Sequence, residues 1–396
     1  MDFSFSSDER AFRDRVRAFI EANPPAGFEH DGMDGGYGAG AHSRSFMRAL
    51  GAAGFIGLTW PASIGGQEQP FSYKLILLEE LALAGAPFGP LVGVDQAAEV
   101  VIRFGSERLR GELLPAIRRG EILFWQGFSE PEAGSDLLAL RTRATRQGDR
   151  YRIDGHKIWS SHAGVSDIGL LLARTDPQAR AHQGVTMFAL PNGTPGLSIQ
   201  PIRSMAGAVY HHEVFLDGVE LHQDHRLGEE NAGFAVLLKG LDSDRFWGRF
   251  YKGPALARIL DRLERFAREQ RAGGASLWSD SETRRRFARL RTEVEVVRTL
   301  FWHCGCLLRD GDDTPYQTAL YKVQADELGQ KIAAFGMQLL GPHGTLAEGA
   351  PHEQLDGEIR HLYLSSMGQT IAGGTSEVLR TTVATRGLGL PRARRA

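Results

Sequence analysis

The spacing of apolar residues changes twice along this chain, and these two changes restrict the fold more than any other feature. Up to about residue 120, apolar side chains recur at helical intervals, as Phe12 and Val16 do. From about residue 121 they alternate over short segments, as in strands, and after Gly233 the helical spacing returns. The sequence therefore predicts an α+β fold of three domains: helical residues 1–120, a β-domain at 121–230 and helical residues 231–396.

Local signals mark where several elements begin and end. Ser6 and Glu9 have capping-box spacing, so a helix is expected after Ser6. Gly148-Asp149 and Asp154-Gly155 are turn signals that enclose a short expected strand, and Asp217-Gly218 is expected to follow the last strand. Long helices are expected at about 281–309 and 314–340, with a shorter one at about 376–387.

Composition excludes several classes of protein. A hydrophobic content of 42% and a charged content of 24% are ordinary for a globular protein, and a formal charge of -2 gives no reason to expect a nucleic acid partner. No apolar run is long enough to span a membrane, and the N-terminus does not resemble a signal peptide. The cysteines are too few for a disulfide framework, which favours a reducing, cytoplasmic location.

The histidine pairs give only weak evidence for a metal site. His211-His212 and His222-x-x-His225 lie near the closing strands without cysteine or paired carboxylate support, so solvent-facing side chains are expected and no metal is predicted. Cys304 and Cys306 lie in an expected helix and are predicted to pack in the core. No Gly-x-Gly-x-x-Gly follows a strand, so a Rossmann nucleotide site is not indicated.

Two segments of the expected β-domain are rich in hydroxyl groups and backbone donors. Residues 128–136 read Phe-Ser-Glu-Pro-Glu-Ala-Gly-Ser-Asp, and residues 157–161 read Lys-Ile-Trp-Ser-Ser. At this spacing they resemble the flavin-binding signature of the acyl-CoA dehydrogenase family, and the order of helices, sheet and helices matches that fold over essentially the whole chain. Either segment alone can be a simple turn, so both segments and the domain order carry the resemblance together.

The resemblance implies an N-terminal helical domain, a central β-barrel-like domain and a C-terminal four-helix bundle. It implies an enzyme that uses FAD to convert an acyl-CoA thioester to the 2,3-enoyl-CoA, with an electron-transferring flavoprotein as acceptor. FAD is then expected between the β-domain and the C-terminal helices, partly bound by a neighbouring subunit. A homotetramer, or a heterotetramer with a related subunit, is the expected assembly.

A flavin ring needs a flat apolar wall on one face and hydrogen bonds at its polar edge. Trp159 can supply the wall, and Ser129 and Ser161 can supply hydroxyl groups to the edge. The family often has Thr where Ser129 and Ser161 stand, and either residue donates a hydroxyl. The resemblance also implies that Phe128 contacts the cofactor and that Ser135 lies beside the acyl-CoA.

The resemblance implies a second set of cofactor contacts in the C-terminal half. Arg271 matches the arginine that reaches the pyrophosphate, although the Ala-Gly-Gly-Ala after it departs from the family's aromatic-glycine pair. Gln338 and Gly341 match a glutamine and glycine turn that binds the flavin nucleotide of a neighbouring subunit. The loop and helix start that cradle flavin and substrate correspond to Gly374, Thr375 and Glu377.

Removal of a weakly acidic α-proton needs a positioned carboxylate and hydrogen bonds to the thioester oxygen. Many family members place a glutamate just before Gly-Thr, where this chain has Gly373, so only the backbone N–H is retained there. A minority, including the isovaleryl and long-chain enzymes, place the base on a helix, and Asp244 matches that position. Asp244 lies on the apolar stripe of Leu237 and Leu241, and Arg245 matches an arginine near the CoA moiety.

Several alternatives stay open. Asp244 has one methylene fewer than the glutamate of the minority enzymes and can instead pair with a nearby arginine; Asp242, off the stripe, is the second candidate for the base. With no glutamate at either known position, the chain can be the flavin-binding subunit of a heteromeric dehydrogenase. A flavin monooxygenase on the same fold needs no such base, and a scaffold that has lost its chemistry is the third alternative.

Overall fold

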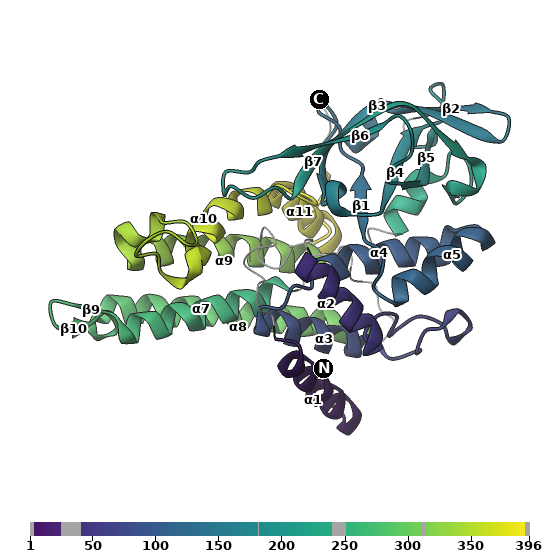
Figure 1. The fold of residues 1–396 in the computed structure, drawn as a ribbon. Coiled ribbons are helices and arrows are strands. Elements are labelled where there is room, and N and C mark those ends of the chain that lie inside the picture. The colour runs from purple at the N-terminus through teal and green to yellow at the C-terminus, as the bar shows by residue number, and fades with distance from the viewer. Residues whose placement is uncertain are drawn as a thin grey trace. The chain divides into compact units, whose positions relative to one another are not determined.

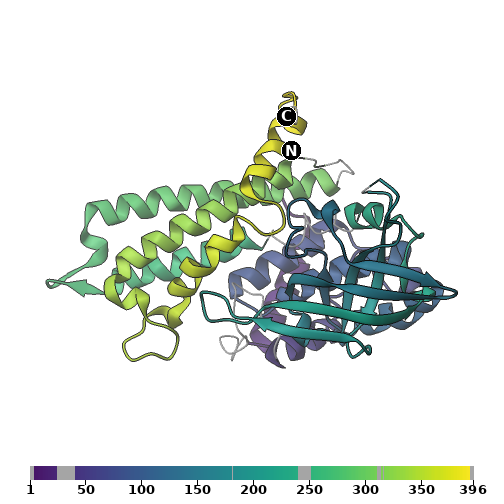
Figure 2. The ribbon, with the colours of Figure 1, turned by 90° about the horizontal axis from the view of Figure 1, so that it is seen from above.

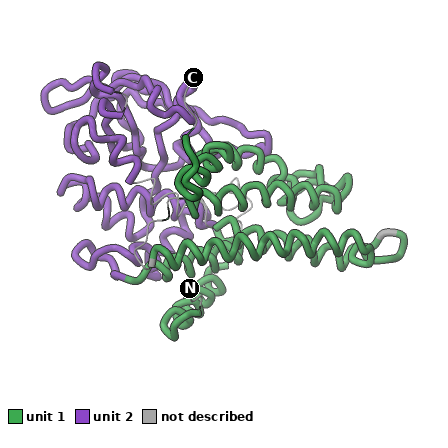
Figure 3. The backbone as a smooth tube through the Cα atoms, turned by 180° about the vertical axis from the view of Figure 1, so that it is seen from behind, with its two compact units in different colours: residues 1–25, 69–86, 249–396 green, residues 26–68, 87–248 purple. Residues whose placement is uncertain are grey.

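The computed structural model describes residues 4–24, 41–180, 182–239, 251–309, 314 and 316–392. The chain divides into two compact units, drawn in green and purple in Figure 3. Unit 1 comprises Met1–Pro25, Gln69–Ala86 and Arg249–Ala396, and unit 2 comprises Ala26–Glu68 and Pro87–Gly248. Among the described residues, no helix is both long enough and apolar enough to cross a membrane.

Unit 1 is mainly helical. A bundle is formed by α7 (Lys252–Glu269), α8 (Ser281–Arg309), α9 (Gln317–Leu340) and α10 (Glu358–Gln369). Figures 1 and 2 show α7, α8 and α9 running side by side. In α7, leucines at helical spacing (Leu256, Leu260 and Leu263) are buried on one face, which explains why this helix packs against its neighbours. The other elements of unit 1 are α1 (Ser7–Ala22), α3 (Phe71–Ala84), α11 (Ser376–Thr382), β9 (Arg271–Ala272) and β10 (Ala275–Ser276).

The first helix, α1, begins at the capping box that the sequence predicts. The Ser6 hydroxyl accepts a hydrogen bond from Glu9 N at 3.1 Å, and the Glu9 carboxylate accepts one from Ser6 N at 2.8 Å. Phe12 and Val16 are buried, and the helix packs against α3. The predicted start of this helix is therefore confirmed.

Unit 2 contains the sheet, whose strands follow the order β6-β7-β3-β2-β4-β5-β8, with β1 paired in parallel to β4 (Figure 1). The strands are β1 (Phe124–Gly127), β2 (Arg143–Gln147), β3 (Arg150–Ser161), β4 (Ile168–Arg174), β5 (Val185–Pro191), β6 (Leu197–Ile202), β7 (His211–His222) and β8 (Arg226–Leu227). The helices of this unit are α2 (Ala41–Ala52), α4 (Gly89–Phe104) and α5 (Glu107–Arg118). Residues 233–239 are also helical.

The sheet of unit 2 encloses one apolar core. Buried side chains of β1, β2, β3, β4, β5 and β7 belong to this core. The rings of Tyr151 in β3 and Phe188 in β5 have centroids only 5.0 Å apart. These strands are three positions apart in the strand order, which corresponds to about 14 Å in a flat sheet. The sheet is therefore strongly curved, as expected for a barrel-like domain.

Two expected turns are irregularities inside continuous strands. The prediction that Asp154-Gly155 and Asp217-Gly218 are turns is wrong, because β3 and β7 run through them. The register between the two strands shifts at this point, and Gly218 N donates to Asp154 Oδ1 at 2.7 Å. A Cβ atom on Gly155 would lie 2.4 Å from Thr142 Oγ1. Gly155 is needed here because the neighbouring segment approaches closely. An Asp-Gly pair occurs both at such close approaches and at chain reversals, so the sequence alone does not distinguish them.

Candidate active site

Trp159 lies in a bulge near the end of β3. The register between β3 and β7 shifts between Lys157 and Ser160, and Trp159 adopts a left-handed backbone conformation with φ of 59°. Such a conformation is unusual for a bulky residue and indicates a local constraint. Lys157 and Ser160 in this segment are buried and Ile158 is half-buried, whereas Trp159 is 57% exposed. The bulge therefore presents a flat aromatic surface at the end of the strand.

The segment that follows β1 is bonded directly to the Trp159 bulge. Ile158 N donates to Ser129 O at 3.0 Å, so Ser129 lies beside the residue that precedes Trp159. Phe128 and Ser129 are half-buried, as is Ser161 at the last position of β3. The structure thus brings the predicted ring contacts Phe128, Ser129, Trp159 and Ser161 together within unit 2. Their roles toward a cofactor stay predictions.

A buried ion pair holds these two segments in place. Lys157 Nζ donates to Glu130 Oε1 at 2.8 Å and to Phe128 O at 3.2 Å. Burial lowers the pKa of Lys157 to about 8, against the opposing effect of the Glu130 charge. Burial alone would raise the pKa of Glu130, but the Lys157 charge and hydrogen bonds from Lys157, Thr142 and Arg141 outweigh it, so this pKa is lowered. The sequence predicted no role for Lys157 or Glu130. Glu130 is one of three acidic residues in its segment, so its charge alone does not single it out.

Ser135, the predicted acyl-CoA contact, lies in the loop that continues from Ser129. This loop is narrowed by a pair of backbone hydrogen bonds of 3.0 Å between Glu130 and Ala133. Ala133 is buried, and Ser135 is exposed. The Glu130–Ala133 hydrogen bonds fix the start of the loop, and the exposed Ser135 follows in the same segment as Ser129.

The predicted nucleotide contacts of unit 1 gather at one end of the helical bundle. Arg271 is exposed in the β9–β10 hairpin, where its Nη1 donates to Gly274 O at 3.2 Å. Gln338 is exposed near the end of α9 and accepts a hydrogen bond of 2.6 Å from Arg286 Nη1 in α8. Gly341 follows with φ 57° and ψ −136°, a conformation that essentially only glycine adopts.

The predicted substrate loop lies between α10 and α11. Gly373 and Gly374 have φ of 60° and 95°, in the left-handed region that favours glycine. Thr375 is the N-cap of α11, and its hydroxyl accepts a hydrogen bond from Val378 N at 3.2 Å. Glu377 is exposed in the first turn, and hydrogen bonds from its own backbone N–H and from Thr375 lower its pKa.

These two sets of unit 1 residues lie at opposite ends of α9. Lys322, near the start of α9, contacts Gly374, whereas Gln338 lies sixteen residues later, about 24 Å along the helix axis. The structure therefore does not bring Arg271, Gln338 and Gly341 together with the Gly373–Gly374 loop in one chain.

The predicted base lies outside the described residues. This applies to Asp244, to the second candidate Asp242 and to Arg245, because the structure does not describe residues 240–250. The preceding residues 233–239 are helical, and Leu237, on the stripe predicted for Asp244, is buried.

The histidines depart in part from expectation. The prediction of solvent-facing side chains is wrong for His212, which is 6% exposed, and its burial lowers the pKa of the imidazole. His222 lies 3.2 Å from the Asp224 carboxylate. Within the described ranges, no group of three or more His, Cys, Asp or Glu side chains could hold a metal ion. Cys304 and Cys306 are buried, which confirms their predicted core positions.

Comparison with known proteins gives matches over nearly the whole chain. Family models described as acyl-CoA dehydrogenase N-terminal, middle and C-terminal domains match residues 6–121, 126–219 and 231–388. Acyl-CoA dehydrogenase FadE26 of Mycobacterium tuberculosis is 30% identical over 403 residues, covering 100% of both chains. Among solved structures, the Tcur3481-Tcur3483 steroid ACAD is 31% identical with a TM-score of 0.90, covering 99% of this chain and 100% of that one. The ChsE4-ChsE5 complex of M. tuberculosis is 29% identical with a TM-score of 0.88, covering 99% and 100%.

Proposed function

Because this chain belongs to the acyl-CoA dehydrogenase family, it is an FAD-dependent oxidoreductase acting on acyl-CoA, and we propose that it forms the 2,3-enoyl-CoA with Asp244 as the base. FAD, when bound, would supply the acceptor for the hydride that leaves the substrate β-carbon. The Asp244 carboxylate takes the α-proton, and the Gly373 N–H donates to the thioester oxygen. Arg245 and Ser135 are assigned to the acyl-CoA.

The position of Trp159 is the observation that carries this proposal. Its exposed indole follows Ile158, which is bonded to Ser129, and Ser161 lies two residues further on. A flat apolar surface and two hydroxyl groups therefore gather at the end of β3. These residues fit a flavin ring, which needs both a wall and a polar edge.

The separation along α9 supports cofactor binding by two chains. The Gly373–Gly374 loop and Thr375 are assigned to flavin and substrate. Gln338 is about 24 Å away along the helix axis, which favours contacts of Arg271, Gln338 and Gly341 to the cofactor of a neighbouring subunit. Cofactor sites shared between at least two chains follow from this assignment, and a tetramer is the assembly that the family resemblance implies.

Anaerobic flavin bleaching by a panel of acyl-CoA thioesters tests Asp244. The parent holoenzyme is expected to bleach with at least one thioester. Asp244→Ala, still yellow, is expected to bleach at least about 100-fold more slowly, because proton abstraction has lost its base. The measurement is the decay of flavin absorbance in a stopped-flow instrument.

Asp242→Ala is the matched control, because it removes the other carboxylate of the same segment. It is expected to bleach like the parent. Equal rates for the parent and Asp244→Ala would remove Asp244 from the mechanism, and a loss confined to Asp242→Ala would transfer the role to Asp242.

A heteromeric enzyme is the second candidate, favoured by the glycine at position 373 where many relatives carry a glutamate. The names of two relatives, Tcur3481-Tcur3483 and ChsE4-ChsE5, each join two chains, and one names a steroid. We infer that steroid thioesters belong in the substrate panel, and that an electron-transferring flavoprotein reoxidises the enzyme. The free thiols of Cys304 and Cys306 support a cytoplasmic location.

A further inference from the structure

The loop between α10 and α11 carries two consecutive glycines in left-handed conformations, Gly373 and Gly374. Glycine loses more backbone freedom on ordering than any other residue, so this pair needs outside restraint to keep one conformation. Within the described residues, neither glycine N–H donates a hydrogen bond to the protein, so both donors are available to a ligand. The contacts that restrain the loop therefore determine the direction of the Gly373 and Gly374 N–H groups.

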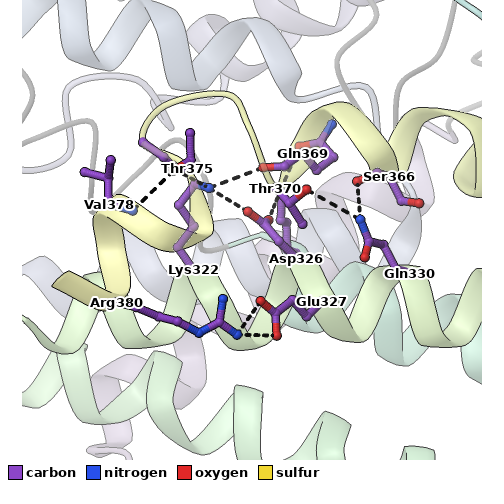
Figure 4. Close-up of polar contacts among 12 residues, drawn as sticks. Lys322, Asp326, Glu327, Gln330, Ser366, Gln369, Thr370, Thr375, Val378 and Arg380 are labelled. Carbon is purple, nitrogen blue, oxygen red and sulfur yellow. Dashed lines mark hydrogen bonds and ion pairs between the residues drawn. The ribbon is translucent and has the colours of Figure 1, made fainter. Parts of the chain in front are cut away.

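Lys322 of α9 contacts this loop directly (Figure 4). Its Nζ donates to Gly374 O at 2.9 Å and to Gln369 O, at the end of α10, at 3.2 Å. The Asp326 carboxylate, one helical turn further along α9, accepts a third hydrogen bond at 2.7 Å. One ammonium thus joins the two sides of the loop to α9, and charge-assisted hydrogen bonds of this kind are stronger than neutral ones.

A second buried lysine keeps this anchor rigid. Lys252, at the start of α7, contacts the other oxygen of Asp326 and donates to Gln369 Oε1 at 2.7 Å. Lys252, Lys322 and Asp326 are all buried. Gln369 is therefore held by Lys322 through its backbone and by Lys252 through its side chain, which ties α7, α9 and α10 together at the base of the loop.

Both flanks of Gly373 are fixed by these contacts. On one side, Ala372 N donates to Gly368 O at 2.9 Å; on the other, Lys322 holds Gly374 O, and Ser376 N donates to Thr370 O at 3.0 Å. We propose that Lys322 is a positioning residue that fixes the Gly373–Gly374 loop, so that the Gly373 N–H meets the thioester oxygen. This inference rests on the proposed function, in which that N–H polarises the substrate.

Hydrogen exchange of the loop and flavin bleaching together test Lys322 on the holoenzyme. In Lys322→Met, Asp326 keeps Lys252 as its partner, so the fold is expected to survive. The exchange rate of amides in residues 370–376 is expected to rise at least about tenfold. The bleaching rate at saturating acyl-CoA is expected to fall at least about tenfold with KM little changed, because misplaced groups slow the chemical step. Lys322→Gln, which keeps an N–H donor without the charge, is expected to lie between parent and Lys322→Met in both measurements.

Lys331→Met is the matched control on the same helix, because Lys331 pairs with Glu293 at the surface. It is expected to leave exchange and bleaching unchanged. Unchanged loop exchange in Lys322→Met, or faster exchange with an unchanged bleaching rate, would overturn the positioning role; should Lys322→Met not fold, Lys322→Gln decides by the same two measurements. A parent that no thioester bleaches contradicts the proposed function, and the exchange data then still decide whether Lys322 fixes the loop.

Discussion

Lys157 and Glu130 join the segment of Ser129 to the segment of Trp159. Each residue was visible inside a motif, but the sequence does not show that both are buried or that they pair. Most basic residues of this chain are arginines, and few are lysines. Four of these lysines are buried, namely Lys74, Lys157, Lys252 and Lys322. Lysine suits such sites because its compact ammonium can satisfy several close acceptors, as the contacts of Lys157 and Lys322 show.

Replacing Lys157 tests this pair as a source of stability. Lys157→Met leaves the buried Glu130 carboxylate without its counter-charge, so we expect a loss of about 3 kcal/mol in the free energy of unfolding. Lys331→Met, which breaks an exposed pair, is expected to cost no more than about 1 kcal/mol. Denaturant titration of both variants measures the difference, and equal midpoints would show that the buried pair contributes nothing special.

The pH dependence of the same variant has a defined sign. The pKa of Lys157 is lowered from 10.5 to about 8 in the folded chain, so between these values the unfolded chain binds more protons than the folded one. The stability of the parent relative to Lys157→Met is therefore expected to rise from pH 8 to pH 10, by at most about 1.4 kcal/mol per pH unit. A difference that is constant or falls over this range would contradict the lowered pKa.

At the element scale, helices with strong local signals could be predicted and strand interiors could not. The expected helices at 281–309 and 314–340 correspond to α8 and α9, and the one at 376–387 to α11 with its π-helical continuation Val383–Gly387. The Asp154-Gly155 prediction failed because a bulge and a turn use the same residues. The partners of β3, and the contact of α9 with the glycine loop, depend on residues distant in sequence, which no local pattern encodes.

The capping box of α1 gives a test at this scale. Ser6→Ala removes the hydroxyl that accepts from Glu9 N, which is expected to weaken the helix start by about 1 kcal/mol. Amides in the first turn of α1 should then exchange about fivefold faster. Ser7→Ala is the control, since the hydrogen bond of the Ser7 hydroxyl among the described residues is a long one of 3.4 Å to the exposed Asp8 carboxylate. Indistinguishable exchange in the two variants would mean that the cap contributes little.

At the scale of the whole molecule, the helical and sheet-forming parts were predictable, whereas the contacts between distant helices were not. The sequence suggested three consecutive domains, whereas the compact units combine Gln69–Ala86 with the C-terminal helices and Pro87–Gly248 with residues 26–68. Contacts of α3 with α7 and α8 produce this grouping. Hydrophobic periodicity identifies an element but not its distant partner.

Purification of the chain alone tests its assembly. If the chain suffices for activity, native mass spectrometry should give four times the 43.5 kDa of one chain, with bound FAD and bleaching by an acyl-CoA. The separation of the two contact sets along α9 is the physical reason to expect more than one chain, since each cofactor then draws on two chains; the number four is what the family resemblance implies. A colourless or inactive chain that gains colour and activity on co-expression with a related chain would instead support the heteromeric enzyme.

The left-handed conformation of Gly373 has a consequence for how this enzyme can change during evolution. At φ of 60°, a side chain of any L-amino acid raises the backbone energy, by about 1–2 kcal/mol for most residues. Reintroducing the glutamate that many relatives carry at this position would therefore work against the local backbone, even where the codon change is simple. A glutamate at position 373 is therefore expected to be accommodated at lower cost where the loop also changes its backbone conformation.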